Sequence, residues 1–259
     1  KKICLVVANY PVKNGRIANG VGLDTPESIV QILEWLNESG HFIGNDKYPI
    51  NGNLLINELL KRRTNDPETK KNDPIDYLSL ENYNLWWNQL PEYSKNKIIE
   101  RWGLPEDSQD IEDKGFAIHG ILYGNISILI QPSRGYDPNN INDLHSPDLV
   151  PPHRYLAQYL WVKHYHKSHV IIHVGKHGSL EWLPGKAVGL SRQCYPQIAI
   201  EELPNIYPFI VNDPGEGSQA KRRSQAVIID HMTPPLGIAG LHGDLLTIEM
   251  LLDEYYESK

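Results

Sequence analysis

The chain has 259 residues, of which 40% are hydrophobic and 22% charged, enough for one large domain or two modest ones. Lys and Arg number 25 against 32 Asp and Glu, and the net charge of -7 argues against a protein whose main task is binding nucleic acid. The longest apolar runs, residues 3–8 and 126–130, are too short to cross a bilayer. We therefore expect no stable membrane insertion.

The two cysteines, Cys4 and Cys194, make neither a disulfide framework nor a CxxC zinc site. Cys4 lies in an apolar run, so we expect a small buried residue there. A reducing, cytoplasmic setting fits this cysteine usage best. The sequence begins without a methionine, and we expect it to be a piece of a longer polypeptide.

The first forty residues predict the opening of an α/β unit. Residues 2–8 are apolar and β-branched, which is typical of a buried strand. After a glycine-dotted loop, Asp24 is a helix N-cap, with Pro26 in the first turn and Glu27 three residues after the cap. An apolar stripe follows at helical spacing, made of Ile29, Ile32, Leu33 and Leu36.

We expect residues 41–114 to form a helical insertion or lid. Residues 54–63 and 83–102 have helical patterns, the second broken near Pro91, and residues 61–76 are a polar, mixed-charge loop. The region carries no recognisable chemistry. Its tryptophans are expected to pack in a core, because no basic residues alternate with them as in a base-stacking surface.

The α/β pattern returns at residue 116. Residues 116–122 and 125–131 flank Tyr123 and Gly124 and predict a hairpin. Beyond the long, proline-rich loop 132–152, the pattern predicts helices at 153–167, 214–231 and 245–255 and strands at 170–174 and 206–211. This alternation predicts an α/β fold with an open, mostly parallel sheet flanked by helices.

The densest chemistry lies in KHYHKSHVIIHVGKHGSLEWLPG, residues 163–185. His173 ends a predicted strand, and ligands of open α/β sheets bind beyond the carboxyl ends of strands. His177 follows in a tight glycine-bracketed loop. Glu181 stands between two large apolar residues, which raise a carboxyl pKa toward the range that a proton acceptor needs. Imidazole with carboxylate also suits Co, Ni or Zn, so these three residues are candidate catalytic and metal-binding groups.

A plainer interpretation stays open for this cluster, in which His173 is a hydrogen-bonded core histidine and Glu181 a surface acid.

Two other segments are weaker candidates. NDPGEGSQAKRR, residues 212–223, places glycines at a predicted helix N-terminus, which suits an anion, but Arg222 and Arg223 also fit a basic solvated face. Arg134 in a proline-stiffened loop is able to pair with a carboxylate, or the loop is purely structural.

Together these segments resemble the CobN/magnesium-chelatase large-subunit family. The matching stretches span residues 9–236, with a poorly matching interior at 41–114 and the main motif-bearing region at 116–236. They are NYPVKNGRIANGVGLDTPES, QPSRGYDPNNINDLHSPDLVPPHRYLA, HVGKHGSLEWLPGKAVGLS and LPNIYPFIVNDPGEGSQAKRRSQAVIIDHMTPPL. The magnesium branch has a threonine where Lys176 stands and a different segment at 213–217, so both departures favour the cobalt branch.

The resemblance implies an internal α/β fragment, residues 1–259, of a tetrapyrrole-binding, metal-inserting subunit. Such a ligase places Co(II), its substrate metal, into hydrogenobyrinic acid a,c-diamide during cobalamin biosynthesis. ATP would be hydrolysed by a separate AAA+ ATPase subunit with its co-subunit, and this fragment would be inactive alone.

The resemblance also implies roles for single residues. Glu181 would accept a proton or bind the metal transiently, and His173 and His177 would present the metal. The substrate-binding residues would be Arg134, Lys176, Trp182, Lys186 and Arg222, of which the cations hold peripheral carboxylates.

Three alternatives stay open. The nearest is a magnesium chelatase H-type subunit that acts on protoporphyrin IX. Another is a non-enzymatic tetrapyrrole or metal carrier. The third, a nucleotide-binding α/β domain, is disfavoured because its GxG pairs lack the spacing of a phosphate-binding loop.

Overall fold

The computed structural model describes residues 1–9, 13–20, 22–44, 48–135, 146–175, 178–208, 214–230, 241 and 243–258. Within them, one sheet has six strands in the order β5-β6-β1-β7-β8-β9. These are β5 (Gly120–Tyr123), β6 (Ile126–Ile130), β1 (Ile3–Val7), β7 (Val170–Val174), β8 (Asn205–Pro208) and β9 (Ala226–Ile229). All neighbours are parallel except β5 and β6, which confirms the predicted mostly parallel sheet and its hairpin.

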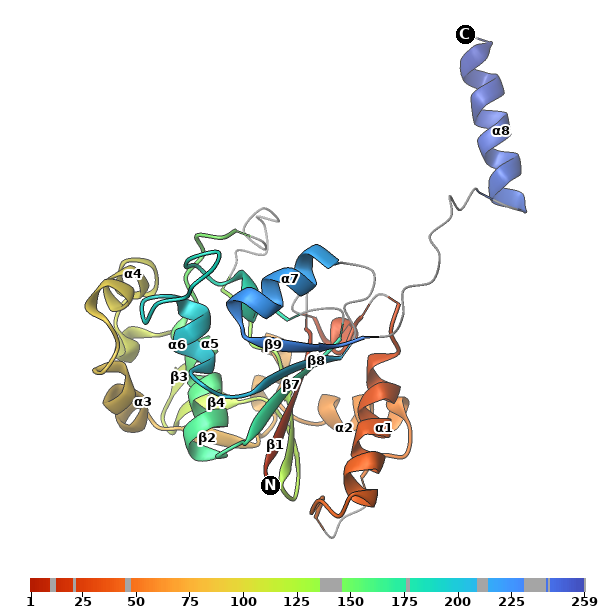
Figure 1. Ribbon diagram of the computed structural model, residues 1–259. Helices are drawn as coiled ribbons and strands as arrows, with labels where there is room; N and C mark the ends of the chain where they lie inside the picture. Colours follow the sequence, from red (N-terminus) through yellow and green to blue (C-terminus); the bar gives the residue numbers. More distant parts are fainter. Residues whose placement is uncertain are drawn as a thin grey trace.

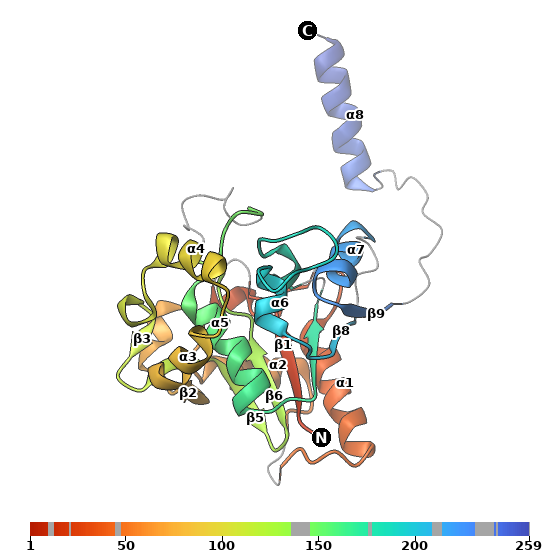
Figure 2. The ribbon, with the colours of Figure 1, turned by 60° about the vertical axis from the view of Figure 1, so that its left-hand side comes forward.

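Helices cover both faces of this sheet (Figures 1 and 2). On one face lie α1 (Thr25–Glu38) and α2 (Gly52–Leu60), over the apolar residues of β1 and β6. On the other face lie α5 (His153–Leu160), α6 (Tyr195–Ile200) and α7 (Pro214–Arg223). The result is a three-layer α/β arrangement, and the carboxyl ends of β1, β6, β7 and β8 meet at one edge.

The predicted start of α1 is confirmed. The side chain of Asp24 accepts a hydrogen bond from the Glu27 amide at 3.1 Å, which satisfies a free donor of the first turn. Ile29 and Leu33 of the apolar stripe are fully buried against the sheet. Cys4 is buried in β1, also as predicted.

Residues 41–114 are only partly helical. Besides α2 they contain α3 (Leu80–Trp87), α4 (Glu92–Trp102), the short 3-10 helices η2 (Pro67–Lys71) and η3 (Pro105–Asp107), and strands β2 (Asp76–Leu78) and β3 (Ile111–Glu112). Both strands pair antiparallel with β4 (Gly115–Ile118) in a second, small sheet. The prediction of a helical insertion or lid overlooked these strands because they are only three and two residues long. Trp87 is buried and Trp86 and Trp102 pack against the same apolar cluster, as expected of core residues.

Two predicted boundaries move in the second half of the chain. The helix predicted at 214–231 ends at Arg223, and Ala226–Ile229 instead forms strand β9 beside β8. The run AVII is apolar and β-branched, so pairing with β8 overrides the continuation of the helix. The predicted helix 153–167 is α5 followed by η5 (Trp161–Tyr165), a π-helical turn. Residues 209–211 of the predicted strand lie outside the described residues.

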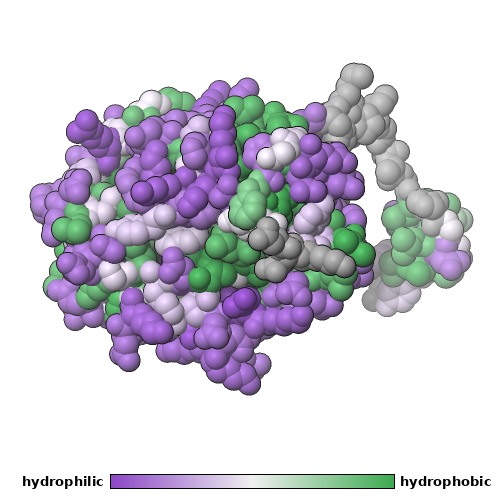
Figure 3. All heavy atoms as spheres, turned by 90° about the horizontal axis from the view of Figure 1, so that it is seen from below, coloured by the Kyte–Doolittle hydropathy of each residue, from purple (hydrophilic) through white to green (hydrophobic). Residues whose placement is uncertain are grey.

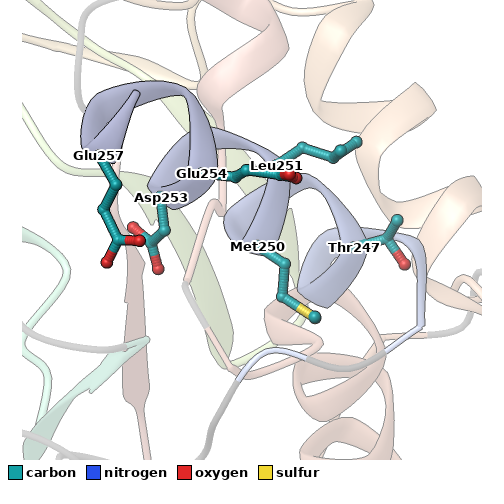
Figure 4. A pocket seen from close by; sticks show the side chains of 6 residues that line it. All are labelled: Thr247, Met250, Leu251, Asp253, Glu254 and Glu257. Atoms are coloured by element: carbon teal, nitrogen blue, oxygen red, sulfur yellow. The ribbon is translucent and has the colours of Figure 1, made fainter. Parts of the chain in front are cut away.

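The last helix, α8 (Asp244–Glu257), stands apart from the body and all its residues are exposed (Figures 1 and 2). The described residues that line a hollow of about 430 Å³ beside it all belong to this helix, as the side chains in Figure 4 show. In the view from below, hydrophilic and apolar residues are interspersed over the body, with one group of apolar residues near the middle (Figure 3). Among the described helices, none combines the length and the apolar character needed to span a membrane.

Candidate active site at the carboxyl end of β7

Glu181 lies in η6 (Leu180–Trp182), a short 3-10 helix that follows β7, and its side chain is fully buried. The hydroxyl of Tyr207 donates a hydrogen bond to its Oε2 at 2.8 Å. Tyr207 belongs to the neighbouring strand β8 and is itself fully buried. The suggestion that Glu181 is a surface acid is therefore wrong, and the carboxyl group belongs to the core at the carboxyl end of the sheet.

His173 is buried within β7, with both ring nitrogens in hydrogen bonds. Nδ1 lies 2.8 Å from Oδ1 of Asn205, and Nε2 lies 3.0 Å from the hydroxyl of Tyr159. Asn205 uses its amide nitrogen to donate to the carbonyl of Ser224, so its Oδ1 accepts and Nδ1 of His173 carries the proton. Nε2 then accepts from Tyr159. Burial lowers the pKa of His173 to about 4, so the ring is neutral.

The two motif residues meet at Tyr207. Its ring stacks on the His173 ring, with centroids 4.8 Å apart and planes 22° apart, while its hydroxyl reaches Glu181. Gly178 makes this contact possible, because a Cβ there would lie 2.6 Å from the Tyr207 hydroxyl and 3.3 Å from Cδ2 of His173. Two of the three residues predicted to form a cluster, His173 and Glu181, thus contact the same tyrosine, which comes from the neighbouring strand β8.

Two buried arginines act on Glu181 electrostatically. Burial lowers the pKa of Arg134 and of Arg223. The negative charge of Glu181 raises the pKa of each guanidinium group and so offsets part of this effect. Each guanidinium also binds backbone carbonyls. Arg134 Nη2 donates to those of Ser146, Leu149 and Trp182 at 3.0, 3.3 and 3.0 Å. Arg223 donates to those of Leu183, at 2.6 Å, and Lys186, at 3.2 Å.

These bonds give the two arginines a structural role around Glu181. They tie the segment after β6 and the end of α7 to the stretch 182–186, which directly follows Glu181 in the chain. The predicted role of Arg134 toward a ligand carboxylate stays a prediction, since in this structure its Nη2 is bound to the protein's own carbonyls. Arg223, treated from sequence as part of a basic face, is buried instead.

The other predicted site residues are distributed differently. Lys186 and Arg222 are exposed, and Trp182 is half-buried beside Glu181. Lys176 and His177 lie outside the described residues. Among the residues that the structure does describe, no three His, Cys, Asp or Glu side chains are grouped to hold a metal ion. For His173 to bind a metal, its Nε2 would have to exchange the Tyr159 hydroxyl for the ion.

Cys194 closes the loop after η6. Its Sγ lies 3.4 Å from the backbone amides of Lys186 and Ser191 and 3.6 Å from the Ser191 hydroxyl. Burial raises the pKa of this thiol, but these donors outweigh burial and lower the pKa overall. The thiol thus helps to fix the segment that carries Lys186.

Sequence reasoning missed Tyr207, Tyr159 and Asn205. Successive side chains of a strand point to opposite faces of the sheet, so the sequence of β8 was enough to place Tyr207 on the same face as Asn205. The pairing with Glu181, 26 residues away, was not, because it depends on β7 and β8 being neighbours in the sheet.

A separate cavity of about 460 Å³ lies where the segment after α4 meets the start of α5. Its lining comprises Arg101, Trp102, Asp107, Ser108, Gln109, Asp110, Ser133, Gly135, Pro152, His153 and Arg154. None of the predicted site residues that the structure describes is among these, so the described lining is distinct from the cluster around Glu181.

Comparison with known proteins identifies clear relatives. The chain is 48% identical over its full length to the aerobic cobaltochelatase subunit CobN of Pseudomonas aeruginosa and covers 21% of that protein. It is 34% identical, over 99% of its length, to the H subunit of magnesium chelatase from Chlorobaculum parvum, covering 20% of it. The chain thus spans about a fifth of the length of these relatives.

A solved structure agrees with the fold as well as with the sequence. The catalytic subunit of cobaltochelatase from Mycobacterium tuberculosis matches 99% of this chain with a TM-score of 0.79 and 39% identity, and the match covers 22% of that subunit. The family model described as CobN/Magnesium Chelatase matches residues 1–259. Sequence and fold therefore agree, and the chain belongs to the CobN/magnesium chelatase family.

Proposed function

We propose that this chain is an internal part of a chelatase large subunit that inserts Co(II) into hydrogenobyrinic acid a,c-diamide. The higher identity to a cobaltochelatase subunit, 48% against 34% for a magnesium-chelatase subunit, supports cobalt over magnesium. We further propose that ATP is hydrolysed by an AAA+ partner subunit, and that the chain alone does not turn over.

The observation that carries this proposal is the fully buried carboxyl group of Glu181 at the carboxyl end of the parallel sheet. Metal insertion replaces two N–H protons of the macrocycle by one divalent ion, so a base must take up protons at the ring. The hydrogen bond from the Tyr207 hydroxyl and the charges of two nearby guanidinium groups favour the ionised, proton-accepting form of the carboxyl group and oppose the cost of burying it. Glu181 is therefore our proposed acceptor.

Access to Glu181 requires movement, because the side chain is fully buried. The stretch 182–186, which directly follows it in the chain, is fastened to the body by Arg134 and Arg223. We propose that ATP-driven rearrangement by partner subunits displaces this stretch and admits the macrocycle. In this proposal, ATP hydrolysis by the partner subunits drives the movement that exposes Glu181 to the ring nitrogens.

Substrate binding falls to the cations at the rim. Lys186 and Arg222 are exposed, and Arg223 fastens the end of α7 to the carbonyl of Lys186. We propose that Lys186, Arg222 and Lys176 bind the peripheral carboxylates of the ring. Trp182 is proposed to pack on the edge of the ring. His177 remains our proposed residue for presenting the metal, while the hydrogen bonds of His173 favour a supporting role.

The test uses Glu181→Gln in the longer polypeptide with its partner subunits, ATP, Co(II) and the corrinoid. We expect metal insertion to fall by at least about a hundredfold while corrinoid binding is retained, as for loss of a general base. Glu202→Gln is the matched control, because that glutamate is exposed. Normal turnover of Glu181→Gln would overturn the assignment.

The choice of metal branch is tested by titrating the chain with the corrinoid and with protoporphyrin IX while following tryptophan fluorescence. Trp182, adjacent to Glu181, makes the signal sensitive to the site. Preference for the corrinoid supports cobalt. Preference for the porphyrin supports the magnesium branch, and tight binding without insertion when partners are added supports a carrier.

A further inference from the structure

We propose that Tyr207 is a positioning residue for Glu181 and sets the orientation of its carboxylate for proton acceptance. This inference rests on the proposed function, in which Glu181 is the acceptor. It adds a residue from a different strand, 26 positions further along the chain, whose hydroxyl contacts Oε2 of Glu181 at 2.8 Å.

Tyr207 is a rigidly held donor. It is fully buried on β8, and Pro208 and Ile206 on either side belong to the same strand. Burial raises the pKa of Tyr207 well above its usual value, and the negative charge of Glu181 adds to this effect. The hydroxyl therefore keeps its proton and serves as a permanent donor to the carboxylate.

The tyrosine ring is supported from behind by His173. The imidazole stacks on it at 4.8 Å and is itself fixed at both nitrogens, by Asn205 on one side and Tyr159 on the other. The Tyr207 ring thus rests on a side chain that cannot rotate without breaking two buried hydrogen bonds. This assigns to His173 a task that needs a neutral, hydrogen-bonded ring and no metal.

The Tyr207 hydroxyl also has little space in which to move. The Cα of Gly178 approaches so closely that a methyl group there would lie 2.6 Å from the Tyr207 oxygen. Other charged and titratable groups also surround Glu181, namely Tyr155 and Tyr159 on α5, Arg134 after β6 and Arg223 on α7. Tyr207 adds to these groups a hydrogen bond that its hydroxyl donates to Oε2 at 2.8 Å.

A double-mutant cycle in the 259-residue chain tests the contact without any assay of activity. Tyr207→Phe should raise the unfolding equilibrium constant about tenfold or more, because a buried carboxylate loses a donor. In a Glu181→Leu background the same substitution should have no effect or should stabilise, since the hydroxyl then has no acceptor. Equal effects in both backgrounds would overturn the proposal.

The functional arm uses the longer polypeptide with its partners. Tyr207→Phe should lower kcat for metal insertion about tenfold or more, with KM for the tetrapyrrole within about twofold of the wild type. Tyr83→Phe is the matched control, because Tyr83 is equally buried but its hydroxyl contacts His153. Should Tyr207→Phe fail to fold, Gly178→Ala, which crowds the same hydroxyl, is expected to give the same loss of kcat.

The outcomes separate this inference from the proposed function. If Glu181→Gln is inactive and Tyr207→Phe keeps the kcat of the wild type, the positioning role is wrong and the acceptor assignment stands. If Glu181→Gln keeps wild-type turnover, the proposed function is wrong at this residue. A loss confined to KM in Tyr207→Phe would also overturn the inference, because it would indicate a role in binding.

Discussion

Nη2 of Arg134 donates a hydrogen bond to the backbone carbonyl of Trp182 at 3.0 Å, joining two segments that are 48 residues apart in the chain. The same nitrogen binds two carbonyls of the segment 146–149. One buried guanidinium thus fastens together the loop after β6, the segment before α5 and the residues that follow Glu181. Several tests of this arrangement need only the 259-residue chain.

Replacing Arg134 by methionine should destabilise the fold strongly. The substitution keeps the apolar stem but leaves buried carbonyls without their donor, and we expect the free energy of unfolding to fall by about 3 kcal/mol. Urea denaturation followed by circular dichroism measures the change. Arg222→Met, at an exposed position, should change stability by less than about 0.5 kcal/mol. Equal effects of the two substitutions would contradict the buried role of Arg134.

Stability should decrease on acidification between about pH 6.5 and 4. Burial lowers the pKa of His173 to about 4, so in this window the unfolded state binds a proton that the folded state does not. For one fully buried histidine the loss amounts to about 3 kcal/mol. His166, with a pKa lowered to about 4 by burial, contributes in the same direction.

The contribution of His173 is isolated by substitution. His173→Gln should flatten the dependence of the urea midpoint on pH between about 6.5 and 4, at the expense of some stability at neutral pH. The matched control is His169→Gln, because His169 is exposed. An unchanged slope in His173→Gln would show that its imidazole is not the buried, neutral group described.

The two thiols should differ in reactivity. Burial raises the pKa of Cys4 to about 12, whereas the pKa of Cys194 is lowered, since the amides of Lys186 and Ser191 outweigh burial. Alkylation of the native chain with iodoacetamide should therefore modify Cys194 first, as mass spectrometry of peptides would report. Ser191→Ala should slow this reaction, and faster labelling of Cys4 would contradict the assignment.

Gly52→Ala should loosen the contact between α1 and α2. A Cβ at Gly52 would lie 2.8 Å from Cβ of Pro26 and 2.9 Å from the amide of Glu27, both in the first turn of α1. Relief of that overlap should reduce the free energy of unfolding by about 1–3 kcal/mol. Gly15→Ala is the control, because no atom lies within 4 Å of a Cβ there. Equal stabilities would show that α2 shifts freely.

Local patterns predicted much of the fold. The cap at Asp24, the apolar stripe of α1 and the turn at Gly124 specify their elements within a few residues of chain, and the structure has them. β9 was missed because its identity depends on β8 as a partner, which is information that Ala226–Ile229 does not contain. Predictions failed where pairing between distant segments overrode local preference.

The candidate site shows the same division. The positions of His173 near the end of a strand and of Glu181 shortly after it correctly predicted that both lie at the carboxyl end of the sheet. Their burial, and the tyrosine that joins them, follow from β7 lying next to β8 and from α7 covering β8. Arg223 is similar, because Arg222 beside it is exposed, and the hydrogen bonds of Arg223 to the carbonyls of Leu183 and Lys186 depend on the packing of α7 against a distant stretch of the chain.

Strand β9 has a practical consequence for work with this chain. In the described part of the sheet it is the last strand, and its outward residues Val227 and Ile229 are 61% and 57% exposed. An open strand edge beside bare apolar side chains is a template for pairing with another molecule. Preparations of the chain should therefore self-associate as concentration rises, and a lysine at position 227 should keep them monodisperse in light scattering.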